Sequence, residues 1–150
     1  MTCYNEAYLL EHCHEKSDGA CLAGQDNLFD ITGGPILVTE FVGIVTTVIG
    51  AVVATCHIDI TTVEPAADVA LSTDVAITDD TVGTSYIFSV ADPAVLTPNI
   101  PGVDETIPRI AWLCPIGTIK AHCSAANTGN IRWYIVFKPL SPNSFVSVAA

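Results

Sequence analysis

The chain has 150 residues, 50% of them hydrophobic and 14% charged, and it carries a formal net charge of −11 at pH 7. This composition argues against intrinsic disorder, and the length suits one domain with a buried core. Only 5 Lys and Arg side chains stand against 16 Asp and Glu, so the chain lacks the basic surface that nucleic-acid binding requires, and we expect no direct contact with nucleic acid. Residues 1–16 also lack the basic and apolar regions of a secretory signal peptide, which indicates synthesis in a cytoplasm.

Residues 1–26 differ in composition from the rest of the chain, and we interpret them as an N-terminal arm attached to a main domain of residues 27–150. Thr2 or Asn5 could cap a short helix that residues 17–19 would end. An extended arm is the alternative. A terminal segment of this kind often reaches onto a neighbouring subunit.

The arm is rich in cysteine and histidine, which raises the hypothesis of a zinc site. The candidate ligands are Cys3, His12, Cys13 and Cys21. Their spacing lacks the close CxxC pair of structural zinc sites, and on a helix His12 and His14 would point to different sides. A plain arm or a disulfide is therefore the preferred interpretation, with no metal and no cofactor.

Residues 35–63 form the longest apolar stretch, and residues 41–58 carry no formal charge, which raises a membrane-spanning helix as one interpretation. The stretch is dominated by Val, Ile and Thr, and no basic residue flanks it, so two buried strands are favoured over a span and we expect no membrane contact. The chain should reverse near Gly50. The second strand should place Cys56, Ile58 and Ile60 inward, with His57 and Asp59 outward.

The remaining segments alternate between apolar and polar residues and are separated by turns, which is typical of strands. Expected strands are residues 27–32, 69–78, 84–90, 109–114, 117–124, 130–138 and 145–148. The segments 117–124 and 130–138, joined by an Asn-Thr-Gly turn, predict a β-hairpin. Together these elements predict an all-β fold, an antiparallel β-sandwich or jelly-roll-like barrel.

No catalytic motif is present, so we expect no enzymatic activity. His57 and His122 fall on polar strand faces and are interpreted as solvated or interface residues. The three aspartates Asp74, Asp79 and Asp80 fit turns better than a calcium site. A last group falls on apolar faces and is interpreted as small buried hydrophobes: Cys56, Cys114 and Cys123.

Two stretches carry a resemblance to a known type of protein: residues 27–49, NLFDITGGPILVTEFVGIVTTVI, and residues 115–140, PIGTIKAHCSAANTGNIRWYIVFKPL. With the segments between them, they resemble head-decoration, or cement, proteins of tailed bacteriophages. The resemblance implies a homotrimer on the capsid surface of the virion that clamps neighbouring copies of the major capsid protein. Candidate interface residues are Tyr4, Leu9, Tyr86, Trp112 and Tyr134, although packing in the protein's own core is favoured for the last three.

Two other functions remain open. A tail-associated or fibre-tip β-domain that binds a host-surface carbohydrate would use Tyr86 beside Asp79 and Asp80, since sugar sites combine aromatic rings with acids. A small metal-dependent enzyme would be built on the cysteines and histidines of residues 1–26.

Overall fold

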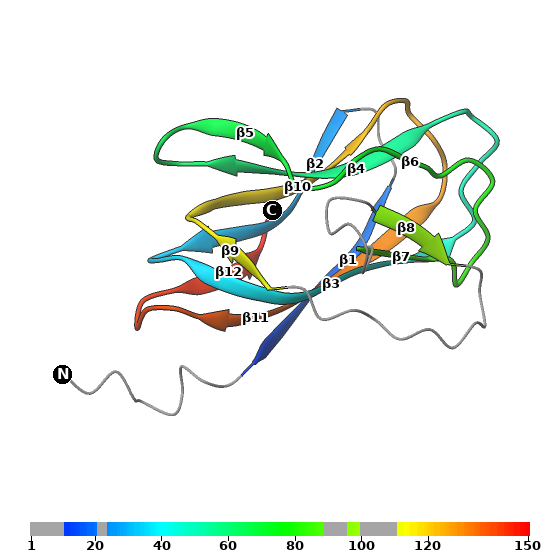
Figure 1. The fold of residues 1–150 in the computed structure, drawn as a ribbon. Coiled ribbons are helices and arrows are strands. Elements are labelled where there is room, and N and C mark those ends of the chain that lie inside the picture. Colours follow the sequence, from blue (N-terminus) through cyan, green and yellow to red (C-terminus); the bar gives the residue numbers. More distant parts are fainter. Residues whose placement is uncertain (1–10, 21–23, 89–95, 100–110) are drawn as a thin grey trace.

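The computed structural model describes residues 11–20, 24–88, 96–99 and 111–150, with the side chains of 17–20 and 96–99 left undescribed. Within these residues the chain is all-β. Two antiparallel sheets pack face to face as a β-sandwich (Figure 1), which confirms the predicted fold class. None of the described segments is a helix long and apolar enough to cross a membrane.

The first sheet, sheet A, has the strand order β1-β11-β3-β7-β8, and β9 also pairs with β3. Its strands are β1 (His12–Ala20), β3 (Ile36–Thr47), β7 (Ser85–Phe88), β8 (Leu96–Asn99), β9 (Trp112–Cys114) and β11 (Asn130–Pro139). The second sheet, sheet B, has the order β12-β2-β10-β4-β5, and β6 also pairs with β4. Its strands are β2 (Gly24–Thr32), β4 (Thr55–Thr62), β5 (Ala67–Ala70), β6 (Val75–Ala76), β10 (Gly117–Cys123) and β12 (Phe145–Val148).

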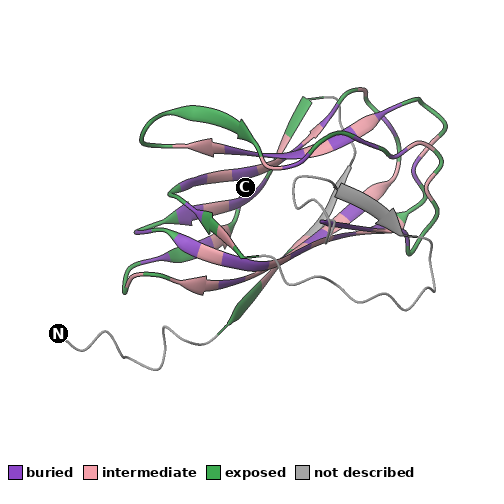
Figure 2. Ribbon diagram, viewed as in Figure 1, coloured by how far each residue is buried: buried purple, intermediate pink, exposed green. Residues whose placement is uncertain are grey.

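The core lies between the sheets and follows from the period-two pattern of the strands. Every second residue of β10 and β11 is buried, so buried and half-buried positions alternate along these ribbons (Figure 2). The inward side chains of β11 are Ile131, Trp133, Ile135 and Phe137, as the pattern predicts. Removal of these apolar surfaces from water is the main stabilising term of such a fold.

The long apolar stretch forms one strand in each sheet rather than a helix. β3 lies in sheet A and β4 in sheet B, and the chain passes between the sheets around Gly50. Asn127 holds this crossing: its Nδ2 donates to the carbonyl oxygens of Gly50 (3.1 Å) and Val52 (2.8 Å). In β4, the predicted inward residues are indeed buried: Cys56, Ile58 and Ile60.

The predicted hairpin of residues 117–138 is wrong. β10 pairs with β2 and β4 in sheet B, whereas β11 pairs with β1 and β3 in sheet A. The connection through Asn127 therefore crosses the sandwich. Alternation specifies which side chains face inward, and this requirement is met whether two successive strands pair or face each other across the core.

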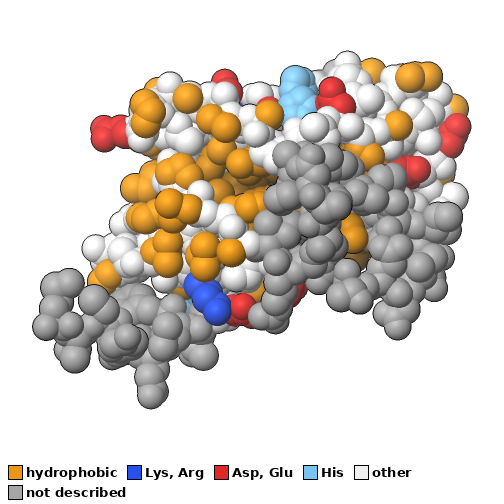
Figure 3. All heavy atoms as spheres, in the orientation of Figure 1, with side chains coloured by type: hydrophobic (Ala, Val, Ile, Leu, Met, Phe, Trp, Pro, Cys, Tyr) orange, Lys and Arg blue, Asp and Glu red, His pale blue; other side chains and the backbone are white. Residues whose placement is uncertain are grey.

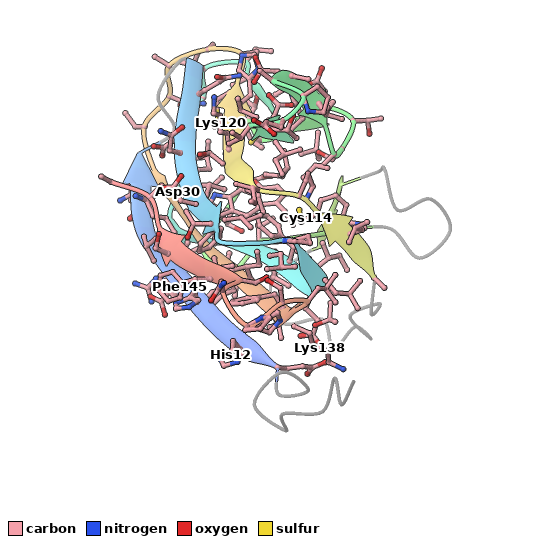
Figure 4. All side chains as sticks on the ribbon, turned by 90° about the vertical axis from the view of Figure 1, so that its left-hand side faces the viewer. His12, Asp30, Cys114, Lys120, Lys138 and Phe145 are labelled. Carbon is pink, nitrogen blue, oxygen red and sulfur yellow. The ribbon has the colours of Figure 1, made fainter. Side chains whose placement is uncertain are left out.

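The helix expected at the N-terminus is wrong over residues 12–17, because β1 is a strand that pairs antiparallel with β11. Both His12 and His14 stack on the ring of Phe137, with centroid distances of 5.6 and 5.7 Å. β1 also runs beside β12 at the edge of the sandwich (Figure 4), where the Lys16 Nζ donates to the carbonyl of Ala149 (2.6 Å). Residues 1–10 lie outside the described part of the chain, and a division between residues 26 and 27 stays a prediction.

Candidate functional site

One end of the sandwich carries a group of exposed apolar side chains. The strand connections at this end are residues 33–35, 63–66, 115–116 and 139–144, on the left in Figure 1. Figure 3 shows hydrophobic side chains gathered over the same end. We call the group the apolar end and define it as Pro35, Val63, Leu113, Pro115, Ile116 and Leu140.

Backbone hydrogen bonds hold the apolar end together across both sheets. Val63 N donates to the carbonyl of Ile116 (3.1 Å), and Leu140 N donates to the carbonyl of Pro35 (3.2 Å). The exposed fraction is 70% for Leu113 and 58% for Val63. Hydrogen-bonded turns therefore present most of these side chains to solvent, and strand β9 presents Leu113.

A pocket of about 480 Å³ opens in the apolar end. It is lined by Pro35, Val63, Glu64, Pro115 and Ile116. Glu64 is the one charged side chain among these lining residues. The surface can therefore receive an apolar side chain of a partner.

A second feature lies on the outer face of sheet B, where two histidines meet. His57 on β4 and His122 on β10 are direct cross-strand partners, and their ring centroids are 4.8 Å apart. Asp59, two residues along β4, faces the same side: its Oδ1 lies 3.0 Å from His57 Nε2 and its Oδ2 lies 3.9 Å from His122 Nδ1. We call these three residues the His–Asp cluster; Figure 3 shows histidine and acidic side chains next to each other at the top of the molecule.

Further polar groups surround the cluster. His57 Nδ1 lies 2.7 Å from Asp74 Oδ1, on the side of the ring away from Asp59. Gln25 Nε2 donates to Asp59 Oδ2 (3.4 Å), and Lys120 Nζ donates to Gln25 Oε1 (3.1 Å). The face of sheet B thus carries a chain of polar contacts that runs from β2 across β10 to β4.

Asp59 is buried although it lies on the outer face of its strand. Alternation places it on the outer face of β4, as expected, yet only 7% of the residue is exposed to solvent. The rings of His57 and His122 and the amide of Gln25 lie against it. The predicted outward direction of Asp59 is therefore correct, but its side chain is covered by these neighbours, and a buried carboxylate needs compensating partners.

The predicted interface aromatics occupy three different environments. Tyr86 is 1% exposed and donates its hydroxyl hydrogen to Asp80, so it belongs to the core and offers no ring face for a partner or a sugar. Trp112 is half-buried, with its ring centroid 4.2 Å from that of Phe88. Tyr134 is half-buried on the outer face of β11, opposite Glu15. Tyr4 and Leu9 lie outside the described residues.

The predicted zinc ligands of the arm are not brought together where the structure describes them. His12 and Cys13 are neighbours on β1, so their side chains leave opposite faces of the strand and do not share an ion. Cys3 and Cys21 lie outside the described residues. The predicted burial of Cys56, Cys114 and Cys123 is confirmed, and burial raises the pKa of the Cys114 thiol to about 12.

Sequence reasoning placed His57 and His122 on polar faces but did not pair them. The alternation in each strand indicates that both histidines face outward. It does not give the register between β4 and β10, which places one histidine opposite the other. The turn interpretation of Asp79 agrees with its left-handed backbone, which has a φ of 61°.

Comparison with protein-family models, curated proteins and solved structures found no match for the chain.

Proposed function

We propose that this chain is a non-enzymatic structural protein of a bacteriophage virion, which binds the exterior of the capsid and stabilises it. The observation that carries the proposal is the apolar end: exposed Val63, Leu113, Ile116 and Leu140 on an otherwise strongly acidic chain. The segments that resemble cement proteins, residues 27–49 and 115–140, supply β3 of sheet A and β10 of sheet B among others, so the resemblance covers strands of both layers.

The acidic surface and the apolar end have opposite effects on association. A net charge of −11 makes free copies repel one another, while an apolar patch gains about 25 cal/mol for each Å² that a partner covers. The proposed partner of the apolar end is the major capsid protein. A homotrimer would present three such ends to neighbouring capsid subunits, and multivalent contact raises the overall affinity without a strong single site. Tyr134 stays a candidate for the contact between copies.

Mass spectrometry of purified particles tests the location. Capsid decoration predicts many copies per particle, in proportion to the capsid protein. A few copies per particle would favour the tail-associated alternative, and absence from particles would contradict both.

Binding to purified, expanded capsids tests the surface. Leu113→Glu should weaken binding, because it places a carboxylate where an apolar contact is proposed. Val82→Glu is the matched control: Val82 is 52% exposed, and it lies beyond the opposite end of β3, where Gly83 N donates to the carbonyl of Val45. Equal binding by the two variants would contradict a role for the apolar end.

A further inference from the structure

We propose that His57, Asp59 and His122 bind one divalent transition-metal ion, with Zn²⁺ as the best match. Each of the three residues offers a ligand atom within 4.8 Å of those of the other two. The contacts with Asp59 indicate His57 Nε2, the Asp59 carboxylate and His122 Nδ1 as these atoms. The proposed ligands include none of the cysteines of the N-terminal segment, and the proposal does not depend on a role in the capsid.

The first argument is the position of the His57 ring between two carboxylates. Its Nδ1 lies 2.7 Å from Asp74 Oδ1, and its Nε2 lies 3.0 Å from Asp59 Oδ1. A neutral imidazole has one N–H and one lone pair, so only one of these contacts can be a hydrogen bond. If Nδ1 carries the proton and donates it to Asp74, the Nε2 lone pair faces an oxygen of the Asp59 carboxylate, and the two electron-rich atoms repel each other. A cation between them would be bound by both atoms and would remove this repulsion.

The second argument is the burial of Asp59. The side chain is 9% exposed, and its hydrogen bond from Gln25 is long, at 3.4 Å. Lys120 is the direct cross-strand partner of Asp59, but its ammonium group donates to Gln25 Oε1 instead. A buried carboxylate is stable when a charge compensates it, and a bound metal ion supplies that charge.

The third argument is geometry. Zinc bonds of about 2.0–2.1 Å in a tetrahedron place ligand atoms roughly 3.3 Å apart. The observed separations lie on either side of that value and involve both oxygens of the carboxylate: 3.0 Å from Asp59 Oδ1 to His57 Nε2, and 3.9 Å from Asp59 Oδ2 to His122 Nδ1. His122 is 40% exposed, so its ring can rotate to close the longer distance, while the backbones of β4 and β10 are paired along their length.

The donor set selects the class of ion. Two imidazole nitrogens and one carboxylate suit Zn²⁺ and its neighbours Co²⁺, Ni²⁺ and Cu²⁺, whereas Ca²⁺ and Mg²⁺ prefer oxygen ligands throughout. Three protein ligands leave one coordination position for water. Asp74 would act as a positioning residue, since a carboxylate on the far nitrogen fixes the tautomer and orientation of a metal-bound histidine.

Calorimetric titration of the chelator-treated protein with Zn²⁺ tests the site, with thermal unfolding as a second readout. Wild type should bind Zn²⁺ and unfold at a higher temperature with the ion than without it. His122→Gln should lose this rise and bind at least about tenfold more weakly, whereas the matched control His14→Gln should behave as wild type. Asp74→Asn should weaken binding about 10- to 100-fold, and Asp68→Asn, on the neighbouring strand, should not.

Cobalt spectroscopy distinguishes metal binding at the proposed site from metal binding by cysteines. Co²⁺ bound by His57, Asp59 and His122 has no sulfur ligand, so its spectrum should lack thiolate-to-cobalt charge-transfer absorption, and the bound Co²⁺ should decrease in His122→Gln. Failure of wild type to bind, a spectrum dominated by thiolate bands, or full-affinity binding by His122→Gln would each overturn the proposal.

Discussion

The indole ring of Trp133 lies directly against Gly43, its cross-strand partner in sheet A. A Cβ atom built on Gly43 would come within 2.6 Å of the indole Cζ3. The ring of Trp133 thus occupies the space in which any other residue at position 43 would place its side chain. Gly43, which interrupts the apolar stretch of β3, is required by packing and not by a turn.

Gly43→Ala should therefore destabilise the protein by about 1–3 kcal/mol, the usual range for an overpacked core. In a Trp133→Leu background the same change should cost little or become stabilising, because alanine is otherwise better than glycine within a strand. Urea unfolding of the two single variants and the double variant measures this coupling. Equal costs in both backgrounds would show that the ring is not the obstacle.

Asn127 should be essential for the crossing between the sheets. Asn127→Ala removes one side-chain hydrogen bond from each of the carbonyl groups of Gly50 and Val52, and we expect a loss of about 1–3 kcal/mol in the free energy of unfolding. Asn127→Asp should cost more, because it keeps the shape but places a carboxylate oxygen against two carbonyl oxygens. Asn143→Asp, at an exposed position, is the control and should change stability by less than about 0.5 kcal/mol. If the Asn127→Asp variant were as stable as wild type, this role would be contradicted.

The buried thiol of Cys114 should make the protein less stable in alkali. Burial raises its pKa from 9.0 to about 12, so above pH 9 the thiol ionises in the unfolded chain but not in the folded protein. This contribution is fully present below pH 9 and is lost as the pH rises toward 12, by up to roughly 1.4 kcal/mol per pH unit. Unfolding free energies of wild type and Cys114→Ala, compared from pH 8 to pH 11, should converge as the pH rises. Parallel curves would contradict the shift.

The described cysteines should differ sharply in reactivity. Cys13 is exposed on β1, while Cys56, Cys114 and Cys123 are buried, and none of the four forms a disulfide. Brief iodoacetamide treatment of the native protein at pH 8, followed by peptide mass spectrometry, should modify Cys13 and leave the other three intact. Treatment in concentrated urea should modify all four. Modification of Cys114 as rapidly as Cys13 under native conditions would show that the core opens readily.

The sequence predicted the fold class because alternation and β-branched residues depend only on local pattern. The inward faces of β4 and β11 came from that pattern directly. The pairing of strands does not follow from that pattern. The alternation predicts a hairpin of β10 and β11, but the two strands lie in different sheets, since two amphipathic strands satisfy the same pattern in either arrangement. Local spacing leaves a helical and an extended arm both open for residues 12–20, because the partner strand β11 lies more than a hundred residues away along the chain.

The candidate sites were less predictable than the fold. Exposed apolar residues such as Val63, in a turn, and Leu113, in β9, come from separate segments, and only the folded chain places them at one end. The His–Asp cluster depends on register: a shift of one residue between β4 and β10 would move His57 away from His122. The burial of Asp59 results from that same register and could not be anticipated from its polar neighbours in the sequence.

The ladder between β4 and β10 has a further consequence, because it joins the two surfaces described above. The His–Asp cluster lies along this ladder, and beyond its end Val63 and Ile116 of the apolar end are hydrogen-bonded to each other. The ladder is therefore the shortest hydrogen-bonded connection between the two surfaces, along which any energetic coupling between ion binding and docking would run. Such coupling is reciprocal: any factor by which the metal tightens docking is the factor by which docking tightens the metal.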